Sequence, residues 1–318
     1  MKKNINAQEI FLLERYISVQ YFGELRDTWA GMVTHLENCL SSFMQNLPKN
    51  YRARPLPEQP DVVWGNRVMP NFRNTLQDLN AGFILLTHGD FEGLTHARGP
   101  QGDFKGQMDY WSGWMVESDE NIYGELLNKA VTLAGNISRT ERAGWGPFDL
   151  VEYGDYLGPL NPPTQWPRYR IQKDVSVATG QKLEKNGIYM PDVNSSCAEF
   201  LSLRYSTAPA AKVHVGLRPI LHPTTGEKYA EEPILEDQDC IWYLVERVLG
   251  QQDDVQNDSA SQLQYIRVAA GTHCPETGFY FTPAEIGSRH LFQKGELMPN
   301  VESAYGRTIW QWDINQSS

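Results

Sequence analysis

The feature that most constrains this chain is a phrase that its C-terminal half contains twice. Residues 177–191 read Val-Ala-Thr-Gly, six residues, then Gly-Ile-Tyr-Met-Pro, and residues 268–283 read Val-Ala-Ala-Gly, six residues, then Gly-Phe-Tyr-Phe-Thr-Pro. The repeated positions are Gly180, Gly187 and Tyr189 in the first copy and Gly271, Gly278 and Tyr280 in the second. Glycine permits tight turns and close approach of strands, so each copy predicts a strand, a turn and a return strand. We therefore expect two similar β lobes.

The first part of the chain has a different period. Apolar residues recur at spacings of three and four within residues 8–47, and the same pattern returns in residues 71–86 and 119–142. In the third segment the expected buried stripe is Ile122, Leu126, Ala130, Leu133 and Ile137. This spacing is typical of amphipathic helices. Residues 1–145 are therefore predicted to form a helical bundle, in which Ser18 or Gly23 bends or splits the first helix.

Glycine and proline dominate residues 146–168, which are predicted to be an ordered junction without regular structure. Beyond it, short runs rich in β-branched and aromatic residues predict strands at 169–178, 188–190, 212–217, 265–269, 278–281 and 308–312. Residues 240–249 fit either a strand or a short helix. The predicted fold class is α+β, an N-terminal helical bundle followed by a β-rich domain over residues 169–318 with an internal duplication.

Composition excludes several classes of protein. The chain has 318 residues, a net charge of −11 and four scattered cysteines without a CxxC pair. The charge argues against nucleic-acid binding, which draws on a basic surface. No apolar run has the ~20 residues of a membrane span, and the first residues lack the apolar core of a secretory signal. We expect a cytoplasmic protein with reduced cysteines, and the sequence leaves its oligomeric state open.

Catalytic motifs are missing. The sequence contains no Gly-x-Ser-x-Gly elbow, no phosphate-binding loop and no Rossmann fingerprint. Cys197 and Cys274 have no activating sequence context. We expect no catalytic residues, no metal and no cofactor. A first alternative is a metal-dependent hydrolase, because His88, Asp90, Glu92 and His96 place metal-capable side chains within nine residues.

Acidic residues form the candidate binding surface. Residues 226–239 hold six acids against one lysine, and a second cluster lies at 253–258. The candidate residues are Glu227, Glu231, Glu232, Glu236, Asp237, Asp239, Asp253 and Asp254. Such a run favours either a solvated loop or a surface that steers a basic protein partner.

Tryptophans come in two close pairs, Trp111 with Trp114 and Trp310 with Trp312. Core packing, interface anchoring and a carbohydrate-stacking platform are all consistent with these pairs. The third interpretation makes a carbohydrate-binding module a further alternative function.

The end of the second copy carries a family resemblance. It combines Gly271 with Cys-Pro and Gly-aromatic, then a Gly-x-x-Met-Pro turn at 295–299 and a Thr-Ile-Trp-Gln-Trp strand at 308–312. This order resembles the large bacterial immunity proteins of families seventy-one and seventy-two. Tyr-Trp-Ser-Gly-Trp at 110–114 fits the same pattern, so the resemblance covers roughly residues 80–312. The first copy departs from it, with Leu183 and Glu184 in place of Cys274 and Pro275.

Members of those families are encoded beside polymorphic toxins, often type VI secretion effectors or Rhs-type effectors. The resemblance implies a cytoplasmic protein that neutralises one cognate antibacterial toxin by stoichiometric occlusion, without catalysis. Its partner would be the toxin domain.

Overall fold

The computed structural model describes residues 5–248, 266–282, 288–301, 308–313 and 316. Its contacts divide the chain into two compact units, Met1–Val248 and Leu249–Ser318. This division differs from the predicted one, which placed both β lobes in one domain over residues 169–318. The first lobe instead shares a unit with the helices, because its strand β3 (Glu199–Leu201) is fully buried and contacts helix α6 (Glu117–Glu141).

The first predicted helix is two helices, α1 (Ala7–Tyr16) and α2 (Val19–Gln45). The break falls at Ser18, whose side chain accepts a hydrogen bond from the Tyr21 amide and so caps α2. The expected apolar stripe is buried along the first half of α2, where Phe22, Leu25 and Trp29 are fully inaccessible to solvent. The helical period and the break at Ser18 are therefore confirmed.

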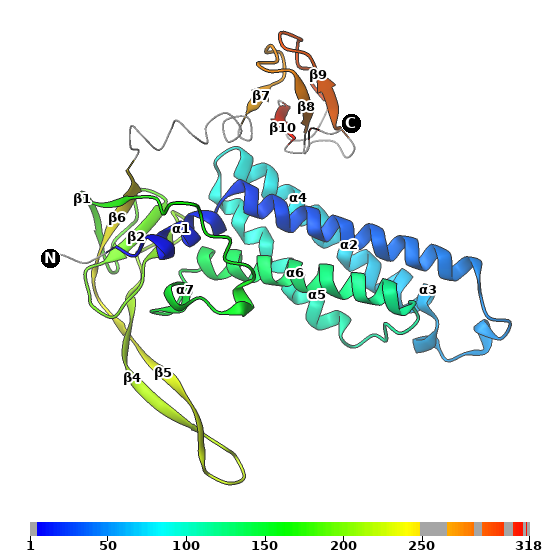
Figure 1. Ribbon diagram of the computed structural model, residues 1–318, viewed down its shortest axis with the longest axis horizontal. Helices are drawn as coiled ribbons and strands as arrows, with labels where there is room; N and C mark the ends of the chain where they lie inside the picture. Colours follow the sequence, from blue (N-terminus) through cyan, green and yellow to red (C-terminus); the bar gives the residue numbers. More distant parts are fainter. Residues whose placement is uncertain (1–4, 249–265, 283–287, 302–307, 314–315, 317–318) are drawn as a thin grey trace. The chain divides into compact units, whose positions relative to one another are not determined.

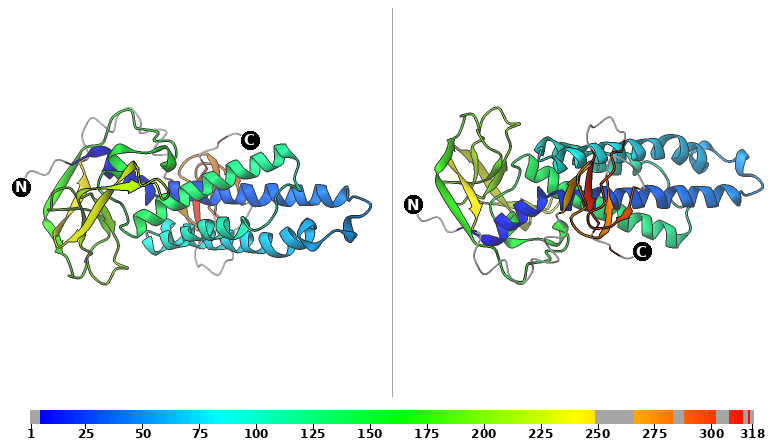
Figure 2. Two further views of the ribbon diagram at one scale, coloured as in Figure 1. Left: turned by 90° about the horizontal axis from the view of Figure 1, so that it is seen from below. Right: turned by 90° about the horizontal axis from the view of Figure 1, so that it is seen from above.

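The other long helices are α4 (Met69–Thr87) and α6, which lie along α2 in both orientations of Figure 2. Their bounds agree with the prediction. In α6 the predicted Ala130, Leu133 and Ile137 are buried, which confirms the second part of the stripe. In its first part the prediction was one residue early, because Tyr123 and Leu127 are buried, whereas Ile122 is 44% exposed. Shorter elements connect the bundle: η1 (Tyr51–Ala53), η2 (Leu56–Glu58), α3 (Pro60–Val63), the π-helical turn η3 (Trp64–Val68), η4 (Phe91–Arg98) and α5 (Gly99–Gln107).

The predicted junction is ordered by hydrogen bonds to the bundle. The Gln8 amide donates to the Leu150 carbonyl at 2.7 Å, and the Asn136 amide donates to the Leu157 carbonyl at 2.9 Å. Contrary to the expectation of no regular structure, the segment contains the short helices α7 (Asp149–Glu152) and η5 (Asp155–Leu157).

The two lobes have the same strand order. In the first, β1 (Tyr169–Ala178), β6 (Ile241–Arg247), β2 (Gly187–Pro191) and β3 form an antiparallel sheet in the order β1-β6-β2-β3. In the second, β7 (Arg267–Ala269), β10 (Ile309–Trp312), β8 (Gly278–Phe281) and β9 (His290–Phe292) form the order β7-β10-β8-β9. Each unit's sheet can be followed by colour in Figure 1. Residues 240–249, left open by the sequence, contain strand β6.

The repeated residues occupy equivalent places in the two lobes. Gly180 and Gly271 both have φ near +80°, at +79° and +78°, a conformation that side chains with a Cβ rarely adopt. Tyr189 and Tyr280 each donate a hydrogen bond of 2.9 Å to the carbonyl oxygen four residues earlier. The duplication is thus present in the structure as well as in the sequence.

The same equivalence extends beyond the repeated phrase. The indole of Trp242 in β6 donates to the Pro209 carbonyl at 2.8 Å, and that of Trp310 in β10 donates to the Pro299 carbonyl at 2.7 Å. Leu183 and Cys274, which differ between the copies, are each 2% exposed and lie in the two lobe cores. The difference between the two copies at this position therefore keeps a buried apolar side chain in each lobe.

No helix in the described part of the chain combines the length and the apolar character that a membrane crossing requires.

Candidate functional site

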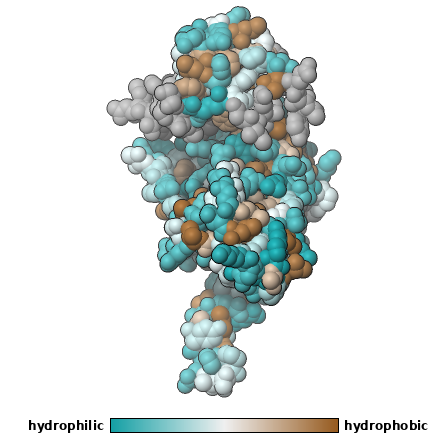
Figure 3. Space-filling model, turned by 90° about the vertical axis from the view of Figure 1, so that its right-hand side faces the viewer, coloured by the Kyte–Doolittle hydropathy of each residue, from teal (hydrophilic) through white to brown (hydrophobic). Residues whose placement is uncertain are grey.

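A long hairpin distinguishes the first lobe. Among the described residues, strands β4 (Ala211–Leu221) and β5 (Lys228–Gln238) pair only with each other. The hairpin projects from unit 1, as Figure 1 and Figure 3 show. Its base is fixed by Ala211 and Val213, which are buried, and by the His214 amide, which donates to the Ser195 carbonyl at 2.9 Å. Beyond that point nearly every side chain is exposed or half-exposed.

Most of the acidic run is strand β5 rather than a loop. Glu227 lies in the tip turn, Glu231, Glu232, Glu236 and Asp237 lie on β5, and Asp239 follows it. The interpretation as a solvated loop is therefore wrong for its central part. The period-2 signal was absent because a strand with both faces in solvent does not alternate apolar and polar residues.

Two of these acids are already neutralised within the hairpin. Glu232 forms an ion pair of 2.5 Å with Arg218, its cross-strand partner, and this contact raises the pKa of the Arg218 guanidinium. Glu231 pairs with Lys228. Glu227, Glu236, Asp237 and Asp239 form no ion pair with any other described residue. Uncompensated charge is thus concentrated near the base of the hairpin and at its tip.

Apolar side chains accompany the charge. Leu217 is opposite Pro233, so these two share a face, and Leu235, two residues further along β5, lies on the same face. Leu217 is 55% exposed and Leu235 40% exposed, and Tyr229 near the tip is 66% exposed. Exposed apolar residues beside charge are typical of protein interfaces.

The hairpin edges are unsuited to adding a further strand. Pro219 lies in β4 and Pro233 in β5, and proline lacks the amide proton that an incoming strand would need. The hairpin can therefore present its side chains to a partner while resisting edge-to-edge pairing.

Three of the four side chains in the alternative metal cluster, all except His96, have separate structural partners. His88 Nδ1 lies 2.8 Å from the Ile84 carbonyl, Asp90 accepts a hydrogen bond from the Glu92 amide, and Glu92 pairs with Arg204 at 3.4 Å. Within the described residues, the one group with metal-binding spacing is His35, Cys39 and Asp119, and it includes none of the four. Sequence reasoning missed this group.

The tryptophan pairs mostly serve the cores. Trp310 is 3% exposed, and Trp310 and Trp312 pack edge-on against Phe292 and Tyr280, respectively. Trp114 is also buried, while Trp111 is 52% exposed and its carbonyl accepts a hydrogen bond from the Trp64 indole. The interpretation as core packing is confirmed for Trp114 and Trp310, and no paired stacking platform is formed.

The remaining candidate residues have plain outcomes. All four cysteines are buried and none is in a disulfide, and desolvation raises the pKa of the Cys197 thiol well above its usual value, which opposes a nucleophilic role. Asp253 and Asp254 lie outside the described residues.

Comparison with protein-family models, curated proteins and solved structures found no match.

Proposed function

We propose that this protein is an immunity protein that binds and neutralises a cognate antibacterial toxin, with the β4–β5 hairpin as the principal contact surface. The toxin as partner comes from the sequence resemblance of the C-terminal segment. The observation that carries the binding role is the projecting hairpin, which combines uncompensated carboxylates with exposed apolar side chains.

Physical chemistry supports this use of the hairpin. A two-stranded hairpin is only marginally stable in water, so docking against a partner would stabilise it. The acids would accelerate the approach of a basic toxin surface, and Leu217, Leu235 and Tyr229 would then be buried against it. The proposed mechanism is occlusion, in which the hairpin enters or covers the basic cleft where the toxin binds its substrate.

The residues of the family pattern have a different part. Gly278, Tyr280 and Trp310 build the second lobe, as their counterparts build the first. In this proposal the repeated positions are the scaffold, and the hairpin supplies the specificity for one toxin.

The first experiment is co-purification with the toxin domain encoded beside this protein, together with rescue of growth in cells that express the toxin. Reversing three unpaired acids, Glu236→Lys, Asp237→Lys and Asp239→Lys, is expected to slow association by about 10- to 100-fold at low salt and to weaken rescue. The loss should shrink as ionic strength rises.

The matched control reverses exposed acids on the bundle, Asp78→Lys with Glu125→Lys, which also form no ion pair with a described residue. These changes should leave association nearly unaffected. If parent and control give neither complex nor rescue, the immunity function is wrong for that toxin. If both variants lose binding equally, the hairpin is not the specific surface.

A further inference from the structure

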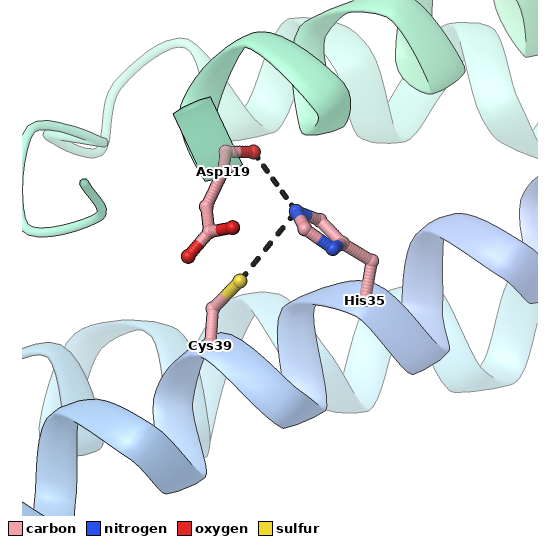
Figure 4. Close-up of side chains that lie close together, drawn as sticks. All are labelled: His35, Cys39 and Asp119. Carbon is pink, nitrogen blue, oxygen red and sulfur yellow. Dashed lines mark hydrogen bonds between the residues drawn. The ribbon is translucent and has the colours of Figure 1, made fainter. Parts of the chain in front are cut away.

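His35, Cys39 and Asp119 form a side-chain group that the proposed function does not use. His35 and Cys39 are four residues apart on α2, so they lie on one face, and Asp119 comes from the first turn of α6. Figure 4 shows the imidazole directed toward both the thiol and Asp119. His35 Nε2 lies 3.5 Å from Cys39 Sγ and 2.9 Å from the Asp119 main-chain oxygen.

The spacing fits a tetrahedral metal ion. The three potential ligand atoms lie within 4.8 Å of one another. Zinc–sulfur and zinc–nitrogen bonds of about 2.3 and 2.0 Å at a tetrahedral angle separate sulfur from nitrogen by about 3.5 Å, close to the observed distance.

The charges of the group also favour a cation. Asp119 forms no ion pair with another residue in the described part of the chain, although its carboxylate is near a buried thiol.

We propose that His35, Cys39 and Asp119 bind a divalent cation of the zinc type. Thiolate, imidazole and carboxylate together are a ligand set that zinc accepts, and water would complete the tetrahedron. On binding, Cys39 releases its thiol proton to solvent. His35 Nε2, which donates to the Asp119 main-chain oxygen in this structure, gives up that hydrogen bond, and the ring proton moves to Nδ1 through solvent so that Nε2 can bind the metal. The ion would hold the middle of α2 to the start of α6.

This site differs from the expectation of no metal. The helical spacing of His35 and Cys39 was a readable signal, since two ligands four residues apart recur in metal-binding helices. Asp119 could not be found from the sequence, because only the folded bundle brings a residue 84 positions away beside His35.

The test uses the whole protein, stripped of metal with a chelator and titrated with Co²⁺ and then Zn²⁺. The expected result is one Co²⁺ per chain, with a thiolate-to-cobalt charge-transfer band and tetrahedral visible bands that Zn²⁺ abolishes. Cys39→Ser should remove the charge-transfer band and weaken Zn²⁺ binding by at least about 100-fold, and His35→Ala should weaken it comparably.

The matched control is Cys240→Ser, because Cys240 is as buried as Cys39, at 8% exposure, but belongs to the first lobe. It should leave the spectrum unchanged. Asp119→Asn, which keeps the size of the side chain, should retain the charge-transfer band while weakening Zn²⁺ binding by about 10-fold. Absence of bound metal in the folded parent, or a charge-transfer band that survives Cys39→Ser, would overturn the site. Toxin binding plays no part in these readouts.

Discussion

The two β lobes share a backbone plan and differ in what is built around it. After the proline that accepts the tryptophan hydrogen bond, the first lobe continues into the β4–β5 hairpin, whereas the second reaches β10 only ten residues beyond Pro299. Strand β3 is buried throughout, but its counterpart β9 exposes His290 and Leu291. The comparison teaches that the repeat specifies the four-stranded sheet of each lobe. The β4–β5 hairpin and the burial of β3 then distinguish the first lobe from the second.

The largest expected effect tests whether the two lobes unfold independently of each other. Trp310→Ala should cost about 3 to 5 kcal/mol and unfold the second unit, because 70 residues support only a small core. Trp242→Ala should instead lower the melting temperature of the helices, since the first lobe shares their unit. Thermal melts followed by far-UV circular dichroism, with limited proteolysis of the second unit, measure both.

The control for this comparison is the helical melting curve of Trp310→Ala, which should match that of the parent. Equal shifts of the helical melt in the two variants would show that the units are not independent.

The second effect tests the equivalent glycines. A Cβ on Gly187 would approach Leu244 Cδ1 at 2.5 Å, the end of a flexible side chain, while one on Gly278 would meet the rigid ring of Trp312. We therefore expect Gly278→Ala to cost about 1 to 3 kcal/mol and Gly187→Ala less. Denaturant unfolding of the two variants measures the difference, with Gly102→Ala, which meets nothing nearby, as the control. A larger cost at Gly187 would contradict the prediction.

How far the sequence could predict these features depends on whether the signal is local. The helical period, the break at Ser18 and the strand bounds of β1 and β8 are local patterns, and all were readable. Strand β5 was missed because both of its faces are in solvent, and the shared unit of bundle and first lobe depends on packing between distant segments. For the candidate site, the acids were identified, but their pairing with Arg218 and Lys228 required the cross-strand register.

The third effect concerns Glu199, which is buried in β3 of the first lobe. Glu199 is the cross-strand partner of Tyr189, and the equivalent partner of Tyr280 in the second lobe is the exposed His290. Its Oε1 accepts the Trp145 amide at 2.9 Å, whereas Oε2 is buried without a hydrogen-bond partner. Desolvation raises the pKa of Glu199 well above its usual value, and Lys212 and Arg139 only partly oppose this.

A raised folded pKa means that the stabilisation from Glu199 is complete below its unfolded pKa and is lost as pH rises through the folded pKa. Glu199→Gln, which cannot ionise, should match the parent near about pH 4 and exceed its stability by about 1 to 2 kcal/mol at about pH 8. Melting temperature across this pH range measures the effect, with the exposed Glu184→Gln as control. A constant difference at every pH would contradict it.

The smallest effect asks whether the repeated tyrosines are energetically alike. Tyr189→Phe and Tyr280→Phe each remove one hydrogen bond of 2.9 Å to a main-chain carbonyl, so each should cost about 0.5 to 1.5 kcal/mol. The two free-energy costs should agree because Tyr189 and Tyr280 are 2% and 0% exposed. Each hydroxyl also donates to the main-chain carbonyl four residues earlier in its own lobe. Denaturant unfolding of each variant, followed by a probe within its own unit, measures them. Markedly unequal costs would mean that the different surroundings of the lobes, and not the repeated phrase, set the energetics of these turns.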